Sequence, residues 1–116
     1  MEKICFLLRV RPDAVHEYIE RHEHAWPELI DALDDSGYRN YSIFADPSGL
    51  LVGYLETHDY AATIAQMKRH AVAERWSIYM DELFLPVDDD HPVGSLRILR
   101  KGFDLDEHLQ RSTTRS

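Results

Sequence analysis

The chain has 116 residues, of which 44% are hydrophobic and 29% are charged. This length and composition fit one globular domain with a modest core and argue against intrinsic disorder. The formal net charge of −8 argues against a nucleic-acid partner, because affinity for phosphates comes mainly from clustered lysines and arginines. No apolar run is long enough to span a bilayer, so we expect no membrane partner.

Two features of the sequence predict a cytoplasmic protein. The N-terminal residues alternate in polarity and reach Arg9 without the apolar stretch of a secretory signal. The single cysteine, Cys5, cannot form an internal disulfide, which fits a reducing compartment.

Apolar residues alternate along residues 4–10, which predicts a first strand with one strongly apolar face. Asp13 stands where a helix N-cap is expected, and residues 15–33 carry an apolar stripe at three- and four-residue steps. Pro27 interrupts this stripe, because proline lacks a backbone donor and clashes with the preceding turn. We therefore expect a kink or break near Trp26 and a shorter helix that begins at Pro27.

Alternation returns at residues 38–45 and 50–56, and a turn of Asp, Pro, Ser and Gly between them predicts a hairpin. Asp59 is expected to cap a second helical stretch that continues or restarts after His70.

A last short strand is expected around residues 96–99. We predict one domain over residues 1–103, followed by a polar, flexible C-terminal tail over residues 104–116.

The order β-α-β-β-α-β is that of the ferredoxin-like, split βαβ sandwich in the α+β class. Its antiparallel sheet carries helices on one face only, and the other face must meet water, a ligand or a partner. In so small a chain, pairing two such sheets covers the second face. We therefore expect a homodimer that forms a dimeric α/β barrel.

Tyr18 and His22 lie one helical turn apart, so their side chains share a face. An inward-facing histidine suits proton transfer near neutral pH. The alternative is a histidine at the edge of the core whose ring nitrogens are satisfied by the backbone. Tyrosines and tryptophans such as Trp26, Tyr41 and Trp76 suit a neutral sugar, since rings cover its C–H face and polar tips meet its hydroxyls.

The sequence predicts no metal site. His22 and His24 are two residues apart on a helix, and His16 and His22 are six apart, so neither pair shares a face well. The acidic run at residues 88–90 lacks the spaced ligands and the glycine of a calcium loop.

Three stretches of the chain resemble the L-rhamnose mutarotase family: residues 10–29, 37–44 and 75–80. The first contains the tyrosine–histidine pair and the Trp-Pro-Glu-Leu element at the family's separation. The similarity reappears near Pro92 and extends from residue 3 to about residue 100. Members of this family are dimeric α+β barrels that interconvert the anomers of L-rhamnose without a cofactor.

The resemblance implies that His22 is the proton donor, that Tyr18 and Tyr41 contact the sugar and that Trp76 lines the pocket. Trp26 and Ser77 complete the predicted substrate-binding set. The family commonly has a second tryptophan where this chain has Ser77, and Glu23 with His24 replaces a pair of the Asn-Pro type. These departures affect which neutral monosaccharide fits more than the type of reaction.

Two other functions fit the same pattern. A cofactor-free monooxygenase of the small-barrel class also lines its pocket with histidine and tryptophan. A non-catalytic dimeric module that binds a small ligand would have the same pocket without proton transfer, since fold alone does not dictate chemistry.

Overall fold

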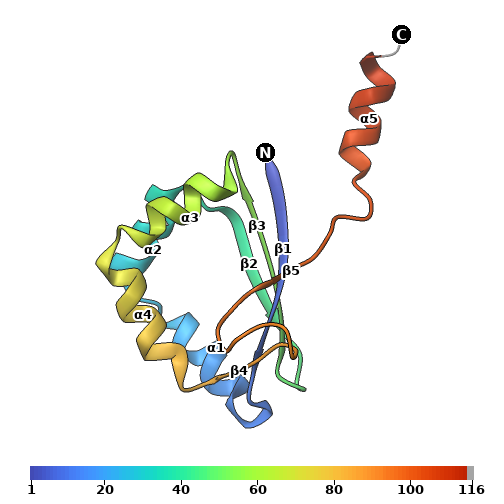
Figure 1. Ribbon diagram of the computed structural model, residues 1–116. Coiled ribbons are helices and arrows are strands. Elements are labelled where there is room, and N and C mark those ends of the chain that lie inside the picture. Colours follow the sequence, from blue (N-terminus) through green and yellow to red (C-terminus); the bar gives the residue numbers. More distant parts are fainter. Residues whose placement is uncertain (115–116) are drawn as a thin grey trace.

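The computed structural model describes residues 1–114 and has a curled sheet with helices along one side (Figure 1). Within these residues no helix is both long and apolar enough to cross a membrane. The elements in chain order are β1 (Glu2–Val10), the 3-10 helix η1 (Pro12–Ala14), α1 (Val15–Glu23), α2 (Pro27–Ser36), β2 (Arg39–Ala45), β3 (Leu50–Thr57), α3 (Tyr60–Lys68), α4 (Ala71–Asp81), β4 (Phe84–Leu85), β5 (Arg97–Ile98) and α5 (Leu105–Thr114).

The sheet has the strand order β2-β3-β1-β4, and β5 pairs with β1 along the same edge as β4. All the pairings are antiparallel, and β1 and β3 form the long central ladder in which Cys5 lies opposite Tyr54 and Phe6 opposite Gly53. This order confirms the predicted ferredoxin-like α+β fold.

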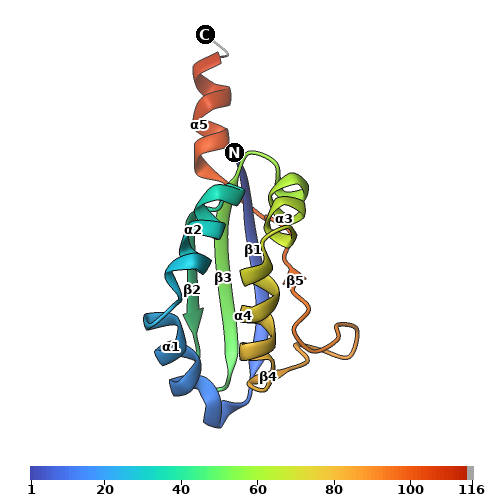
Figure 2. The same cartoon turned by 90° about the vertical axis from the view of Figure 1, so that its left-hand side faces the viewer.

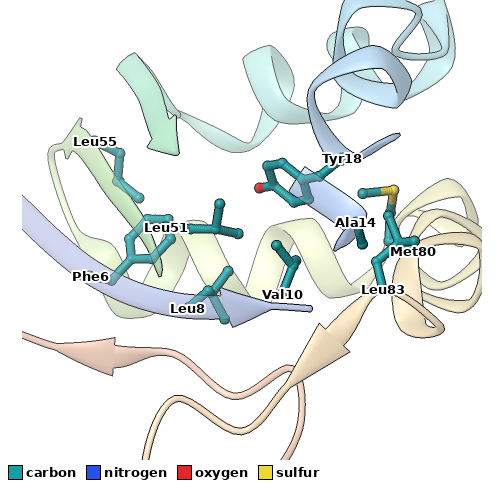
Figure 3. Close-up of a cluster of buried hydrophobic side chains, with 9 residues drawn as sticks. All are labelled: Phe6, Leu8, Val10, Ala14, Tyr18, Leu51, Leu55, Met80 and Leu83. Atoms are coloured by element: carbon teal, nitrogen blue, oxygen red, sulfur yellow. The ribbon is translucent and has the colours of Figure 1, made fainter. Parts of the chain in front are cut away.

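Helices α1 to α4 cover one face of the sheet (Figure 2). Phe6, Leu8 and Val10 of β1 face this layer and join Tyr18 of α1 and Met80 of α4 in the main buried cluster (Figure 3). Because side chains alternate along a strand, Cys5, Leu7 and their neighbours on β3 face the other way. We call this opposite side the outer face; Leu7, Val52 and Tyr54 on it are each half-buried.

The predicted helix break is confirmed. Helix α1 ends at Glu23, Trp26 is extended with φ −63° and ψ 136°, and Pro27 is the first residue of α2. Helix α2 ends at Ser36, and the following Gly37 has a φ of 101°, in the left-handed region that glycine adopts at low cost.

The predicted cap at Asp13 is wrong. The chain first makes the short 3-10 turn η1 beginning at Pro12, and α1 then starts after Ala14 without a side-chain cap. Asp13 pairs instead with Arg11, at 3.3 Å. The cap at Asp59 is confirmed, because its Oδ1 accepts the backbone N–H of Ala62 at 3.1 Å.

The second helical stretch restarts after His70, as the sequence allowed, because the extended backbone at His70 separates α3 from α4. Three other elements differ from their predicted extent. The two-residue strand β4 follows, where only helix and loop were expected, and the last strand is limited to Arg97–Ile98. The predicted tail contains the helix α5, whose first turn is capped by Asp104 through the backbone N–H of Glu107 at 3.3 Å. Residues 115 and 116 of the tail lie outside the described residues.

We expect Gly53→Ala to lower the free energy of unfolding by about 1–3 kcal/mol, because a methyl group in a packed core forces side chains or backbone to move. A Cβ at Gly53 would lie 2.1 Å from Cζ of Phe6. Urea unfolding measures the effect, and Gly102→Ala is the matched control because nothing lies within 4 Å of its added Cβ. Equal midpoints for the two variants would contradict this account of Phe6.

Candidate active site

A cavity of about 740 Å³ lies between the helices and the sheet. Five of the six predicted site residues line it: Tyr18 and His22 of α1, Tyr41 of β2, and Trp76 and Ser77 of α4. The structure therefore brings together side chains that are 59 positions apart in sequence between Tyr18 and Ser77. The remaining wall is mainly apolar and comes from α2, α3 and β2, including Leu29, Leu33, Ile43 and Met67.

The imidazole of His22 is half-buried, and its Nδ1 lies 2.9 Å from the carbonyl oxygen of Tyr18. A carbonyl can only accept, so Nδ1 carries the hydrogen and donates it. In the neutral ring this leaves Nε2 as an acceptor with a free lone pair. Burial lowers the pKa of His22 below its ordinary value, and the hydrogen bond to Tyr18 opposes this only in part. His22 therefore rests as a neutral base.

Tyr18 lies beside His22, with 4.2 Å between the ring centroids. Its side chain is in the main core, and Figure 3 shows its hydroxyl directed away from Ala14 and Met80. No hydrogen bond to this hydroxyl is found among the described residues, where every completely buried side-chain oxygen has a partner. The hydroxyl therefore opens to the cavity. Burial raises the pKa of Tyr18, which keeps the phenol protonated as a donor.

Tyr41 reaches the cavity from β2, beside an irregularity in the pairing with β3 between Arg39 and Ser42. The preceding residue, Asn40, has φ 48°, an uncommon value that asparagine tolerates better than most residues. Burial raises the pKa of the Tyr41 phenol, and the neighbouring phenols of Tyr18 and Tyr38 raise it further.

Tyr38 also lines the cavity, and the sequence did not identify it as a site residue. Its ring lies 5.1 Å from that of Tyr41, and burial raises its pKa as well. The sequence feature that could have indicated this role is the position of Tyr38 directly after Gly37 and three residues before Tyr41. In a strand with regular alternation these two tyrosines would point to opposite faces, so only the irregularity of β2 reveals that they share the cavity.

Trp76 joins His22 to the aromatic wall. Its ring meets that of His22 edge to face at 5.4 Å and that of Trp26 at 5.1 Å. Trp26 is not among the lining residues; its ring packs against those of Trp76 and Tyr79, so it supports Trp76 without lining the cavity. Ser77 is exposed and lines the cavity beside Trp76.

Arg21 holds α1 against α4 next to this site. Its guanidinium donates to the carbonyl oxygen of Tyr79 at 2.7 Å and to Glu82 at 2.6 Å, and it lies 4.4 Å from the centre of the Tyr79 ring. Because His22 is the next residue, these contacts fix its helix relative to Trp76. Among the described residues, no three His, Cys, Asp or Glu side chains gather in a metal-binding arrangement.

The fold and the site define a class of protein: a small ferredoxin-like α+β chain with a histidine and several tyrosines facing an aromatic cavity. The model of the L-rhamnose mutarotase family matches residues 3–105. An L-rhamnose mutarotase from Sinorhizobium fredii is 38% identical over 98 residues, which span 81% of this chain and 90% of the relative. The chain belongs to the L-rhamnose mutarotase family, whose members are isomerases that act on a sugar.

Solved structures agree on the fold. The L-rhamnose mutarotase FA22100 from Formosa agariphila has a TM-score of 0.72 at 24% identity, covering 90% of this chain and 98% of that one. Tetracenomycin F2 cyclase from Streptomyces glaucescens, a type-II polyketide cyclase, has a TM-score of 0.59 at 16% identity, covering 90% and 98%. The second likeness shows that this fold also serves other chemistry, so the function must be argued from the site.

We expect Tyr38→Phe to lower kcat/KM for a sugar substrate about 3- to 10-fold, the worth of one ordinary hydrogen bond. The variant loses a single oxygen and keeps the ring that packs on Tyr41. Anomer exchange measured by NMR gives the rate, and Tyr60→Phe is the matched control because Tyr60 does not line the cavity. Equal losses in the two variants would assign Tyr38 a packing role only.

Proposed function

We propose that this isomerase interconverts the α and β anomers of L-rhamnose, or of a closely related 6-deoxy sugar, by acid–base-assisted ring opening and reclosure. The observation that carries the proposal is the free Nε2 of a neutral His22 beside a cavity with protonated tyrosine hydroxyls. Opening a pyranose requires removal of the proton from the anomeric hydroxyl and protonation of the ring oxygen. Neither step requires a redox change or a covalent intermediate.

His22 acts first as an acceptor in this mechanism. Nε2 takes the proton from the anomeric hydroxyl and becomes the donor that protonates the ring oxygen. One nitrogen can serve both oxygens because they are bonded to the same carbon. The bond from that carbon to the ring oxygen breaks and leaves an aldehyde and a free hydroxyl. Rotation about the adjacent carbon–carbon bond presents the other face of the aldehyde, and reclosure by the reverse steps gives the other anomer.

The tyrosines hold the sugar while the proton moves. Their raised pKa values make Tyr18 and Tyr41 poor acids, so they serve as hydrogen-bond donors to sugar oxygens and do not transfer protons. Trp76 covers the C–H face of the ring, as aromatic side chains do in sugar sites. Ser77 offers a small hydroxyl beside it, which makes related 6-deoxy sugars worthwhile substrates to test.

A homodimer and a cytoplasmic location complete the proposal. The outer face of the sheet carries Leu7, Val52 and Phe44, and no element of the described chain forms a second layer over it (Figure 1). Packing two such faces together would close the dimeric barrel predicted from the fold. The single cysteine fits a reducing compartment.

We expect His22→Ala to slow catalysed anomer exchange about 10²- to 10⁴-fold, the usual contribution of a positioned acid or base. Exchange NMR on L-rhamnose near its anomeric equilibrium measures the rate against a buffer blank. His24→Ala is the matched control: His24 is an exposed histidine on the same helix end whose Nδ1 bonds the carbonyl of Glu20 at 3.0 Å. Full activity in His22→Ala would move proton transfer to another residue.

The same spectra separate the other candidate functions. A non-catalytic binding module would broaden or shift the sugar resonances and leave the exchange rate at its value in buffer. A cofactor-free monooxygenase would consume oxygen in the presence of an aromatic substrate. If the wild-type protein accelerates exchange for neither L-rhamnose nor related 6-deoxy sugars, the proposed function is wrong.

The rate should also depend on pH through His22. The neutral ring is the active form and its pKa is lowered below 6.5, so kcat/KM should rise with pH, with a midpoint below 6.5, and stay flat at neutral pH. Exchange rates between about pH 4 and 8, corrected for the buffer, test this. A profile that falls as pH rises through this range would mean that the imidazolium is the active form.

A further inference from the structure

Helix α5 lies at the end of the chain, at the limit of the family match, which stops at residue 105. Figures 1 and 2 both show it projecting from the body beyond the start of β1. The apolar residues of this segment are largely uncovered: Phe103 is 69% exposed, Leu105 57% and Leu109 55%. Leu105 and Leu109 are four residues apart and therefore share one helix face.

The base of α5 is anchored to the body of the domain. The carboxylate of Asp104 is 5% exposed and pairs with Lys3 of β1 at 2.9 Å and with Lys101 at 3.5 Å. Asp104 also caps the helix through the backbone N–H of Glu107, and Lys101 pairs with the Glu107 side chain. The ion pair with Lys3 lowers the pKa of Asp104 to about 2. These contacts fix the direction in which α5 leaves the domain.

The surface of α5 is continuous with the outer face of the sheet. A hollow of about 490 Å³ is lined by Cys5 and Tyr54 of the outer face and by Leu99, Phe103 and Leu105 of the C-terminal segment. Leu99 is held there by its N–H, which donates to the carbonyl oxygen of Cys5 at 2.9 Å. The uncovered sheet face and the uncovered helix therefore form one surface.

We propose that two copies of this chain pack the outer faces of their sheets together, and that the α5 helix of each copy packs against the other copy. This inference rests on the proposed homodimer. A two-fold pair presents the same surface twice, so it covers both uncovered sheets and both helices in one contact. The helix has 10 residues, about 15 Å at 1.5 Å per residue, which is long enough to reach over a partner.

The amount of apolar surface fits a dimer. The outer face and the C-terminal segment carry large apolar side chains that are each more than a third exposed: Phe44, Leu85, Leu99, Phe103, Leu105 and Leu109. At roughly 100 Å² each they supply about 600 Å², near the ~800 Å² per partner that a standard stable interface buries. Four of these six residues, Leu99, Phe103, Leu105 and Leu109, belong to the C-terminal segment, so this segment supplies most of the strongly exposed apolar surface.

The test is the dimer dissociation constant of the full chain, measured by sedimentation over a dilution series. For the double variant Leu105→Ser with Leu109→Ser we expect the constant to rise about 100-fold, as when central apolar anchors of an interface are lost. Ile78→Ser is the matched control, because Ile78 is 69% exposed on α4, in the layer on the opposite side of the sheet. Its dissociation constant should match that of the wild type.

Circular dichroism checks that the double variant is folded, and isotope-filtered NOEs in dimers mixed from ¹³C-labelled and unlabelled chains provide a second measurement. Contacts from the Leu109 methyls to the unlabelled chain are expected. A wild-type dimer whose dissociation constant is unchanged in the double variant, or is raised equally by Ile78→Ser, overturns the role of α5 and leaves the homodimer standing. A wild type that is monomeric at all concentrations overturns both.

Discussion

The proline at position 27 is the constraint on which the helical layer depends. Proline cannot donate to the turn before it, so α1 ends at Glu23 and α2 starts in a new direction after the extended Trp26. The two helices then cover different parts of the sheet, α1 near the end of β1 and α2 nearer its start (Figure 2). The break leaves His22 on the cavity side of α1 and Trp26, in the extended segment between the two helices, against Trp76.

The reactivity of His22 follows from its own helix. The carbonyl of Tyr18, one turn earlier, holds Nδ1 and fixes the tautomer, and the aromatic neighbours that bury the ring also keep it neutral. The same neighbours give the ring its orientation, through Tyr18 on one side and Trp76 on the other. Position, tautomer and pKa therefore share one structural cause and cannot be changed independently.

Periodicity predicted much of the fold, because a period of two or of 3.6 residues directly reflects which face is buried. It predicted the central strands, the hairpin and the break at Pro27. It failed where a segment is short or its neighbours decide: β4 has only two residues, and Asp13 pairs with Arg11 because Pro12 starts a 3-10 turn before the helix. Helix α5 was missed because its polar sequence has a single apolar pair, Leu105 and Leu109.

The predicted cavity residues came mainly from motif resemblance. Periodicity places a side chain on a face and does not give its depth, so Trp26 was assigned to the cavity although it packs against Trp76 and does not line the space. Tyr38 was not predicted because simple alternation places it on the opposite face from Tyr41. The irregularity of β2 instead brings the two rings together.

The ionisable groups of the cavity wall make it selective by charge. Among the described residues that line it there is no lysine or arginine, and Glu23 is the only acidic one. Its tyrosines stay protonated and its histidine rests neutral. A phosphorylated or carboxylated sugar entering such a wall would give up hydration with no cation to replace it, in a chain that already carries a net charge of −8. Such a wall favours a sugar that carries no anionic group over one that does.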